Sequence, residues 1–157
     1  MSAHATLSPG AGIGLKPEHY ANVLAAGRGG PISFVEVHAD NYFHAGGPAH
    51  RWLSAVAERF PLSFHSVGLS LGRAQGLDAD ALDALAALVA RYQPALVSDH
   101  LAWCATPHER FPDLLPLPLT PATLDHVAEQ VDRVQERLRR AILVENPSRM
   151  LAFAEDC

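Results

Sequence analysis

The sequence predicts an α/β fold of the TIM-type (β/α)8 barrel class, here an incomplete barrel of about five βα units. Strand-like apolar runs alternate with helix-like stretches along the 157 residues, which is typical of parallel βα units. Each unit takes about 30 residues, close to the ratio in a barrel of about 250 residues. Three of the apolar runs also end on a potential metal ligand, and barrel enzymes carry their chemistry at the carboxyl ends of their strands.

Five units do not close an eight-stranded barrel, so an open, doubly wound sheet is the alternative. A dinucleotide-binding sheet of that class carries G-x-G-x-x-G in its first βα turn. This chain has Gly12 and Gly14, but Pro17 stands where the third glycine belongs. We therefore expect a flexible N-terminus over residues 1–11 and a partial barrel domain over residues 12–157, truncated before strands six to eight.

The first two units follow from local signals. A strand is expected at residues 12–15, and Pro17 favours the first turn of a helix after it. Residues 32–37 form an apolar, β-branched run that predicts the second strand. Residues 40–47 are rich in Asp, Asn and Gly and indicate a loop.

The third and fourth units are predicted by helical stripes between short apolar runs. The first stripe comprises Trp52, Leu53, Val56 and Phe60. Pro61 ends that helix, and residues 62–65 form the third strand. Asp78 is suited to cap the next helix. The stripe of that helix comprises Leu82, Leu85, Leu88 and Val89. Pro94 separates it from a fourth strand at residues 95–98.

The last predicted unit follows a long connection. Residues 101–119 contain four prolines and are expected to form a loop, of the kind that builds active sites on the carboxyl face of a barrel. Thr120 and Pro121 then predict a helix start. Its apolar stripe comprises Leu124, Val127, Val131, Val134 and Leu138. A fifth strand is expected at residues 141–145, with a further helix from near Ser148.

Composition excludes several classes of partner. The formal charge of −5 and the pI of about 5.9 give no broad attraction for nucleic acid or anionic membranes. Residues 1–10 lack the basic start and apolar core of a secretory signal, and no apolar run reaches the ~20 residues that span a bilayer. Cys104 and Cys157 form neither a CxxC pair nor a disulfide framework. We expect a cytoplasmic protein with no nucleic-acid or membrane partner.

The candidate metal ligands are His65, His100 and Glu145, which end the predicted strands three, four and five. Neighbouring strands lie ~4.8 Å apart, so these ends can bring three side chains to one ion. Two imidazoles and one carboxylate are a common donor set for catalytic iron or zinc. The alternative interpretation is three polar residues that hydrogen-bond separate loops. Asp99 points to the opposite face of a regular strand and is not expected to be a ligand.

Further candidates surround this group and are expected either to support the ligands by hydrogen bonds or to contact the substrate. Glu36 and His38 are two residues apart, so they share a face if the strand continues. Asn41 lies in the following loop, and Asn146 directly follows Glu145 and is placed to orient its carboxylate. The alternative is a solvated loop and ordinary turn chemistry.

Other reactive side chains have no convergent partners in the sequence. Cys104 has no base or helix start beside it and is not expected to be a nucleophile. No catalytic acid, base or nucleophile is identified. The remaining histidines are expected at the surface, namely His4, His50, His108 and His126.

Six stretches of the chain occur in the order and separation of a known family. They are GIGLKPEHY from Gly12, FVEVHADNYF from Phe34, LSFHSVGLSLG from Leu62, LVSDHLAW from Leu96, LLPLPLT from Leu114 and ILVENPS from Ile142. With them the chain resembles the multinuclear non-haem iron-dependent oxidative enzymes, a methanobactin-maturase-like family long catalogued only as a domain of unknown function. The resemblance covers the N-terminal five-eighths of such an enzyme.

The resemblance implies a TIM-type barrel that holds two or three irons and oxidatively modifies cysteine or nearby backbone in a ribosomally synthesised peptide. It also implies a partner protein that presents the precursor peptide. His65 and His100 match the family's histidine ligands, and Glu145 matches a carboxylate that can bridge two irons. The family's remaining ligands would lie beyond Cys157, so at most a partial site is expected here.

Two other functions stay open on the sequence alone. One is a zinc- or manganese-dependent barrel of the sugar-isomerase or endonuclease type, which uses similar strand-end ligands. The other is a non-catalytic, truncated fragment. An incomplete barrel would also show unpaired strands at both edges of its sheet, so we expect self-association through these edges.

Overall fold

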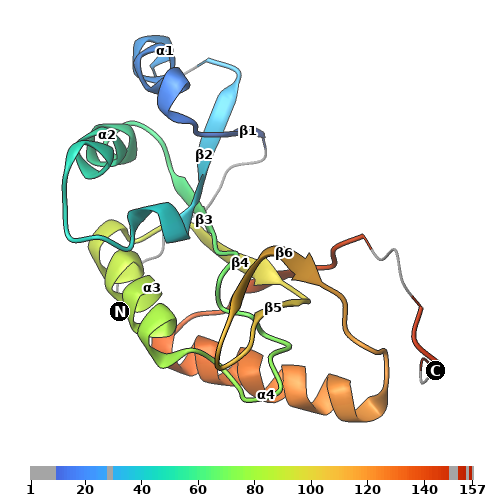
Figure 1. Cartoon of the computed structure of the whole chain (residues 1–157). Helices are drawn as coiled ribbons and strands as arrows, with labels where there is room; N and C mark the ends of the chain where they lie inside the picture. Colours follow the sequence, from blue (N-terminus) through green and yellow to red (C-terminus); the bar gives the residue numbers. More distant parts are fainter. Residues whose placement is uncertain (1–9, 28–29, 149–151, 155, 157) are drawn as a thin grey trace.

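The computed structural model describes residues 10–27, 30–148, 152–154 and 156 (Figure 1). The strands are β1 (Ala11–Gly14), β2 (Ile32–His38), β3 (Leu62–His65), β4 (Leu96–His100), β5 (Trp103–Ala105), β6 (Arg110–Leu115) and β7 (Leu143–Glu145). The α-helices are α1 (Tyr20–Ala26), α2 (Pro48–Ala57), α3 (Ala79–Tyr92) and α4 (Pro121–Leu138). Two 3-10 helices, η1 (Pro17–His19) and η2 (Ala39–Tyr42), follow β1 and β2.

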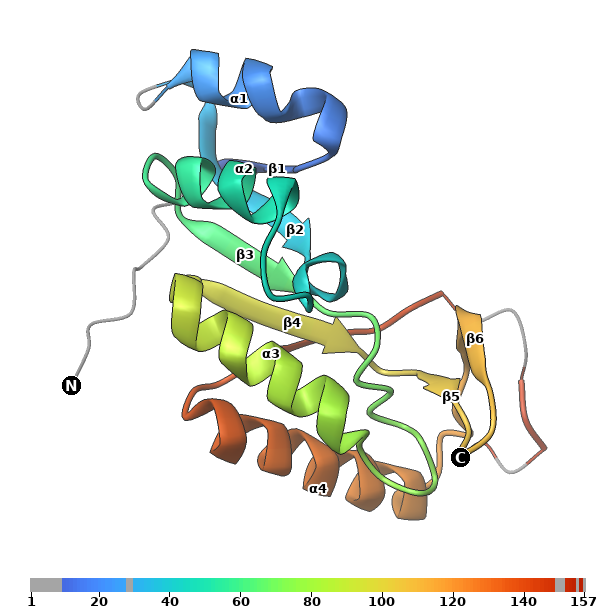
Figure 2. The ribbon, with the colours of Figure 1, turned by 60° about the vertical axis from the view of Figure 1, so that its left-hand side comes forward.

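Five strands form one parallel sheet in the order β1-β2-β3-β4-β7, with β1 and β7 at its edges. The order along the sheet is the order along the chain, as the βα alternation predicted. The four α-helices lie on one side of this sheet, and β5 and β6 form a separate antiparallel hairpin beyond the end of β4 (Figure 2). All five strands therefore direct their carboxyl ends to the same rim.

The two faces of the sheet differ in chemistry because side chains alternate along each strand. The helix-covered face is mostly apolar and belongs to the hydrophobic core, with Val35, Val37, Leu62, Phe64 and Val97 buried there. The register pairs the residues of the opposite face: Glu36 with Ser63, His38 with His65, His65 with Ser98, and His100 with Glu145. The polar face thus collects the sequence's candidate ligands in adjacent strands.

The helix starts follow the predicted caps. The carboxylate of Asp78 accepts from the backbone N–H groups of Asp80 and Ala81 at 3.1 and 3.2 Å, and the hydroxyl of Thr120 accepts from that of Thr123 at 3.2 Å. Leu85, Leu88 and Val89 of α3 are buried, as are Val127, Val134 and Leu138 of α4. Two members of the predicted stripes are exceptions, because Trp52 is 40% and Leu124 70% exposed.

Several predicted boundaries are corrected by the structure. The first strand begins at Ala11, inside the segment expected to be a flexible N-terminus, whose residues 1–9 lie outside the described part of the chain. The fourth strand runs to His100 rather than ending at residue 98, and the fifth begins at Leu143 rather than at residue 141. The helix expected from Ser148 falls partly outside the described residues, and those described at 152–154 and 156 form no helix.

Two segments expected to be loops contain regular structure. Residues 39–42 form η2 because the chain turns tightly at the end of β2, where the N–H of Phe43 bonds to the carbonyl of Asp40. Residues 101–119 contain the β5–β6 hairpin, in which Trp103 pairs with Leu115 and Ala105 with Arg110. A two-stranded hairpin tolerates Pro112 because an edge strand need not donate every N–H.

No helix in the described part of the chain has the length and apolar character needed to cross a bilayer.

Candidate metal centre

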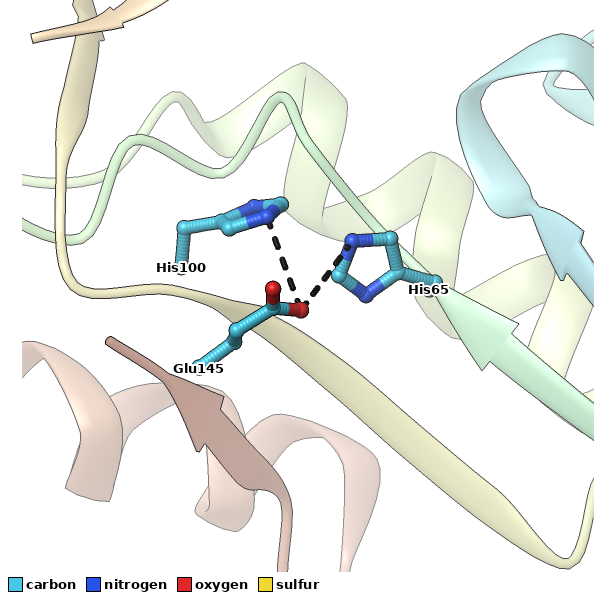
Figure 3. A group of neighbouring side chains, drawn as sticks. All are labelled: His65, His100 and Glu145. Atoms are coloured by element: carbon cyan, nitrogen blue, oxygen red, sulfur yellow. Dashed lines mark ion pairs between the residues drawn. The ribbon is translucent and has the colours of Figure 1, made fainter. Parts of the chain in front are cut away.

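His65, His100 and Glu145 converge at the carboxyl ends of three neighbouring strands, β3, β4 and β7 (Figure 3). Each offers one ligand atom, and these atoms lie within 4.8 Å of one another. The Nε2 atoms of both histidines are 3.7 Å from Oε2 of Glu145. The two imidazole rings meet edge to face with their centroids 4.5 Å apart. The structure therefore brings together all three candidate ligands.

The donor set fits a divalent transition metal. Ligand bonds of about 2.1 Å place neighbouring donor atoms roughly 3.0–3.5 Å apart around a metal ion. The 3.7 Å between each histidine Nε2 and Oε2 of Glu145 is only slightly longer, so small side-chain movements would let these atoms bind one ion. An imidazole must be neutral to bind a metal. Burial, reinforced by the nearby ring of His65, lowers the pKa of His100 below its ordinary value, so the neutral ring is favoured. The arrangement can therefore hold one ion between two imidazoles and a carboxylate.

The group is asymmetric in its exposure. The side chains of His65 and His100 are 11% and 8% exposed, whereas that of Glu145 is 59% exposed on the edge strand β7. Among the described residues, none hydrogen-bonds Nδ1 of His100, although this atom is buried. An ion would thus be enclosed by protein on the histidine side and open on the side of the carboxylate.

Ser98 is a site residue that the sequence did not identify. Its Oγ lies 2.8 Å from Nδ1 of His65, one strand away on the same face of the sheet. A hydrogen bond at Nδ1 holds the ring so that Nε2 faces Glu145. The only sequence signal was its position two residues before His100, which puts both side chains on one face of β4.

The predicted surrounding residues divide into two groups. The ring of His38 meets that of His65 edge to face at a centroid distance of 5.7 Å, so it adjoins the candidate centre. Glu36 precedes His38 by two residues on the same face of β2, and its carboxylate accepts a hydrogen bond from the hydroxyl of Ser63 at 2.9 Å. Asn41 lies on η2 and is exposed. Asn146 is exposed, and in the described part of the chain no hydrogen bond joins its side chain to Glu145.

Asp99 lies on the helix-covered face, as its position in the strand predicted. Its carboxylate accepts from the backbone N–H of Leu69 at 3.2 Å and from that of His100 at 2.5 Å. Burial raises the pKa of Asp99 to about 7, against the opposing effect of these hydrogen bonds. Asp99 therefore ties the loop after β3 to the end of β4 and leaves His100 on the open face.

Two other side chains with reactive groups, those of His50 and Cys104, are buried. His50, expected at the surface, is 2% exposed, with Nδ1 2.8 Å from the hydroxyl of Tyr92 and Nε2 2.7 Å from the carbonyl of His44. Cys104 lies on β5 of the hairpin and is buried, and burial raises the pKa of its thiol. A raised thiol pKa agrees with the expectation that Cys104 is not a nucleophile.

Comparison with known proteins places the chain in a family. The family model described as "RiPP precursor modification enzyme MbnB/TglH/ChrH" matches residues 10–157. A UPF0276 protein of Paraburkholderia phytofirmans is 48% identical over 143 residues, which cover 91% of this chain and 46% of the relative. UPF0276 protein RB0508 of Rhizobium meliloti is 48% identical over 147 residues, covering 92% of this chain and 47% of that protein.

A third relative agrees in extent. A UPF0276 protein of Caulobacter sp. strain K31 is 50% identical over 142 residues, 90% of this chain and 51% of the relative. The chain thus spans about half the length of the curated relatives that it matches. Because the family model covers the whole sheet and all three converging side chains, this chain belongs to the MbnB/TglH/ChrH family of enzymes that modify precursors of ribosomally synthesised, post-translationally modified peptides.

Proposed function

We propose that His65, His100 and Glu145 are ligands of an iron centre that oxidatively modifies a cysteine, or the backbone beside it, in a ribosomally synthesised peptide. The observation that carries the proposal is the convergence of two imidazoles and a carboxylate within 4.8 Å. Membership of a family of precursor-modifying enzymes supports a peptide as the substrate. The geometry thus supports a metal centre, and the family supports a peptide as its substrate.

Iron bound at this group would supply redox chemistry that amino-acid side chains cannot provide. The chain's own residues hold and orient the centre. Ser98 fixes the ring of His65 through Nδ1, and the enclosing protein limits the access of water to both imidazoles. The exposed side of Glu145 is the side from which a substrate thiol can approach.

The proposal extends to a TIM-type barrel completed by three further strands. The sheet is open at β7, and the relatives are about twice as long as the matched segment. Strands beyond β7 would bring additional ligands to the polar face, so that two or three irons could be held in the whole enzyme. A partner protein that presents the precursor peptide is part of the same proposal, on the strength of the family resemblance.

Two alternatives are distinguished by metal and by activity. The same donor set suits zinc or manganese in a barrel of the sugar-isomerase or endonuclease type. The exposure of Glu145 on an unpaired edge favours a second alternative, a non-catalytic fragment whose site is incomplete. Metal analysis separates the first alternative from iron, and turnover separates the second.

The experiment uses protein prepared without oxygen, loaded with ferrous iron and then mixed in air with the peptide-presenting partner protein and a cysteine-containing precursor peptide. Mass spectrometry of the peptide is the readout. The proposal predicts a mass change that is lost in His100→Ala and kept in His108→Ala, whose side chain is exposed on the hairpin. Bound iron without any mass change would support the fragment, and tight binding of zinc or manganese instead of iron would support the isomerase-like enzyme.

A further inference from the structure

Two cavities flank His38 at the carboxyl rim of the sheet. The first, of about 430 Å³, lies between η2, the loop after β3 and the β5–β6 hairpin, and Val67, Phe111 and Leu114 contribute to its wall. The second, of about 390 Å³, lies above the ends of β1 and β2, and its wall includes Tyr42 and Ala49. Each volume lies within the range of sites that enclose small ligands, roughly 300–1,000 Å³.

The two cavities share His38 and Asn41 as lining residues, so they are neighbours on either side of one polar ridge. Both side chains are exposed, and neither hydrogen-bonds another residue in the described part of the chain. The ring of His38 in turn meets the ring of His65 at 5.7 Å. A molecule that lies across the ridge would therefore pass directly beside a candidate metal ligand.

The chemistry of this surface suits an extended polypeptide. The amide of Asn41 has both donors and an acceptor, which match the C=O and N–H of a peptide group, and the imidazole of His38 offers a further polar contact. Apolar side chains line part of the cavity on each side, with Phe111 and Leu114 in one and Tyr42 and Ala49 in the other. An extended chain places alternate side chains about 7 Å apart on one face, so two of them can enter separate cavities.

The geometry points to a peptide-binding trough in which the substrate backbone crosses His38 and Asn41 and its side chains occupy the two cavities. The inference rests on the proposed function, because the occupant is the peptide that the centre modifies. It assigns Asn41 to peptide binding rather than to the metal. It also gives the hairpin, whose residues line one cavity, a role as a wall of the binding site.

Binding is tested on the full chain in the presence of EDTA, so that no metal contributes. The probe is a display library of random peptides of about 12 residues with one fixed central cysteine, which span ~40 Å when extended. Enriched peptides are labelled, and their dissociation constants are measured by fluorescence anisotropy. Three variants alter the trough: Asn41→Ala removes the shared amide, Leu114→Trp fills the first cavity and Ala49→Leu fills the second. Asn22→Ala, on the exposed face of α1, is the matched control.

The trough predicts that each of the three variants raises the dissociation constant about tenfold or more, while Asn22→Ala leaves it unchanged. Circular dichroism melts establish whether each variant is folded. If a cavity-filling variant does not fold, Asn41→Ala still tests the trough, because Asn41 is exposed and its replacement leaves the core intact. Failure to enrich any peptide, or enriched peptides that bind wild type and Asn41→Ala equally, would overturn the inference.

Iron binding is measured separately on the same preparations, which keeps the two proposals apart. Peptide binding that depends on Asn41, in protein that takes up no iron, supports the trough and contradicts the metal centre. Iron uptake together with peptide binding that ignores Asn41 contradicts the trough and leaves the metal centre intact.

Discussion

Nδ1 of His65 lies 2.8 Å from Oγ of Ser98, the residue beside it on the neighbouring strand. With the Nδ1 proton donated to Ser98, Nε2 carries the lone pair and faces Glu145 at 3.7 Å. The hydrogen bond thus fixes the direction of the ring, and the tautomer in which Nδ1 donates to Ser98 is the one that leaves Nε2 free to bind a metal. Residues that fix an imidazole in this way contribute to metal affinity without touching the ion.

We predict that Ser98→Ala lowers the affinity for ferrous iron by about 10- to 100-fold. Ser98→Thr keeps a hydroxyl and should restore most of the affinity. The measurement is anaerobic competition with a chromophoric chelator. Ser33→Ala, on the helix-covered face of β2, is the control and should bind iron like wild type. Equal affinities for Ser98→Ala and wild type would mean that the hydrogen bond does not position a ligand.

The buried pair of Tyr42 and Tyr20 makes stability sensitive to alkaline pH. Burial, and then the hydrogen bond between the two hydroxyls at 3.1 Å, raise the pKa of Tyr42 above its ordinary value of 10.0. A pKa that is higher in the folded state contributes stability that is complete below the unfolded value and is lost as pH rises above it. The free energy of unfolding should therefore fall as the pH rises above about 10.

In Tyr42→Phe the free energy of unfolding should fall less steeply with rising pH, because the hydroxyl that resists ionisation in the folded state is absent. Urea unfolding followed by circular dichroism at several pH values measures the slope. Parallel pH curves for Tyr42→Phe and wild type would assign the alkaline loss of stability to other groups.

The cap of α3 gives a prediction about folding alone. Asp78→Ala removes the acceptor for the N–H groups of Asp80 and Ala81 and should lower the free energy of unfolding by about 1 kcal/mol. Asp78→Asn keeps an acceptor oxygen and should retain most of the stability. The ion pair of Asp78 with Arg110 is partly exposed and adds little. Equal losses in the two variants, measured by urea unfolding, would point to the charge rather than the cap.

The open edge at β7 predicts self-association. Leu143 and Val144 are 53% and 42% exposed on a strand whose outer backbone groups have no partner strand in the described part of the chain. Light scattering of the chain should give a mass above that of the monomer, and Val144→Lys should lower it. Leu124→Lys removes an apolar side chain that is 70% exposed on α4 and should leave the mass unchanged. A monomer with a sharp, cooperative melt would contradict the prediction.

The parallel sheet and the convergence at its rim could be predicted because their signals are local. Short apolar runs bounded by prolines define β3 and β4, and a polar residue at the end of each run is placed by strand geometry. The caps at Asp78 and Thr120 are local too, since each depends on contacts within three residues.

The features that sequence reasoning missed depend on contacts between distant residues. His50 is buried because it meets Tyr92, 42 residues away, and nothing in its own neighbourhood signals this. The β5–β6 hairpin was not predicted because Pro112 lies within β6, and a proline in the sequence usually indicates that a segment is not a strand. Ser98 required the register between β3 and β4, which fixes its position opposite His65.

The most direct test of the account is anaerobic titration with ferrous iron, with metal content determined after desalting. We predict about one tightly bound iron per chain for wild type and for the exposed-site control His108→Ala, because two imidazoles and a carboxylate suffice for one ion. Binding should be lost in His65→Ala, His100→Ala and Glu145→Ala. Iron content that is unchanged in these three variants, or the absence of bound iron in wild type, would contradict the claim that the three side chains share a metal ion.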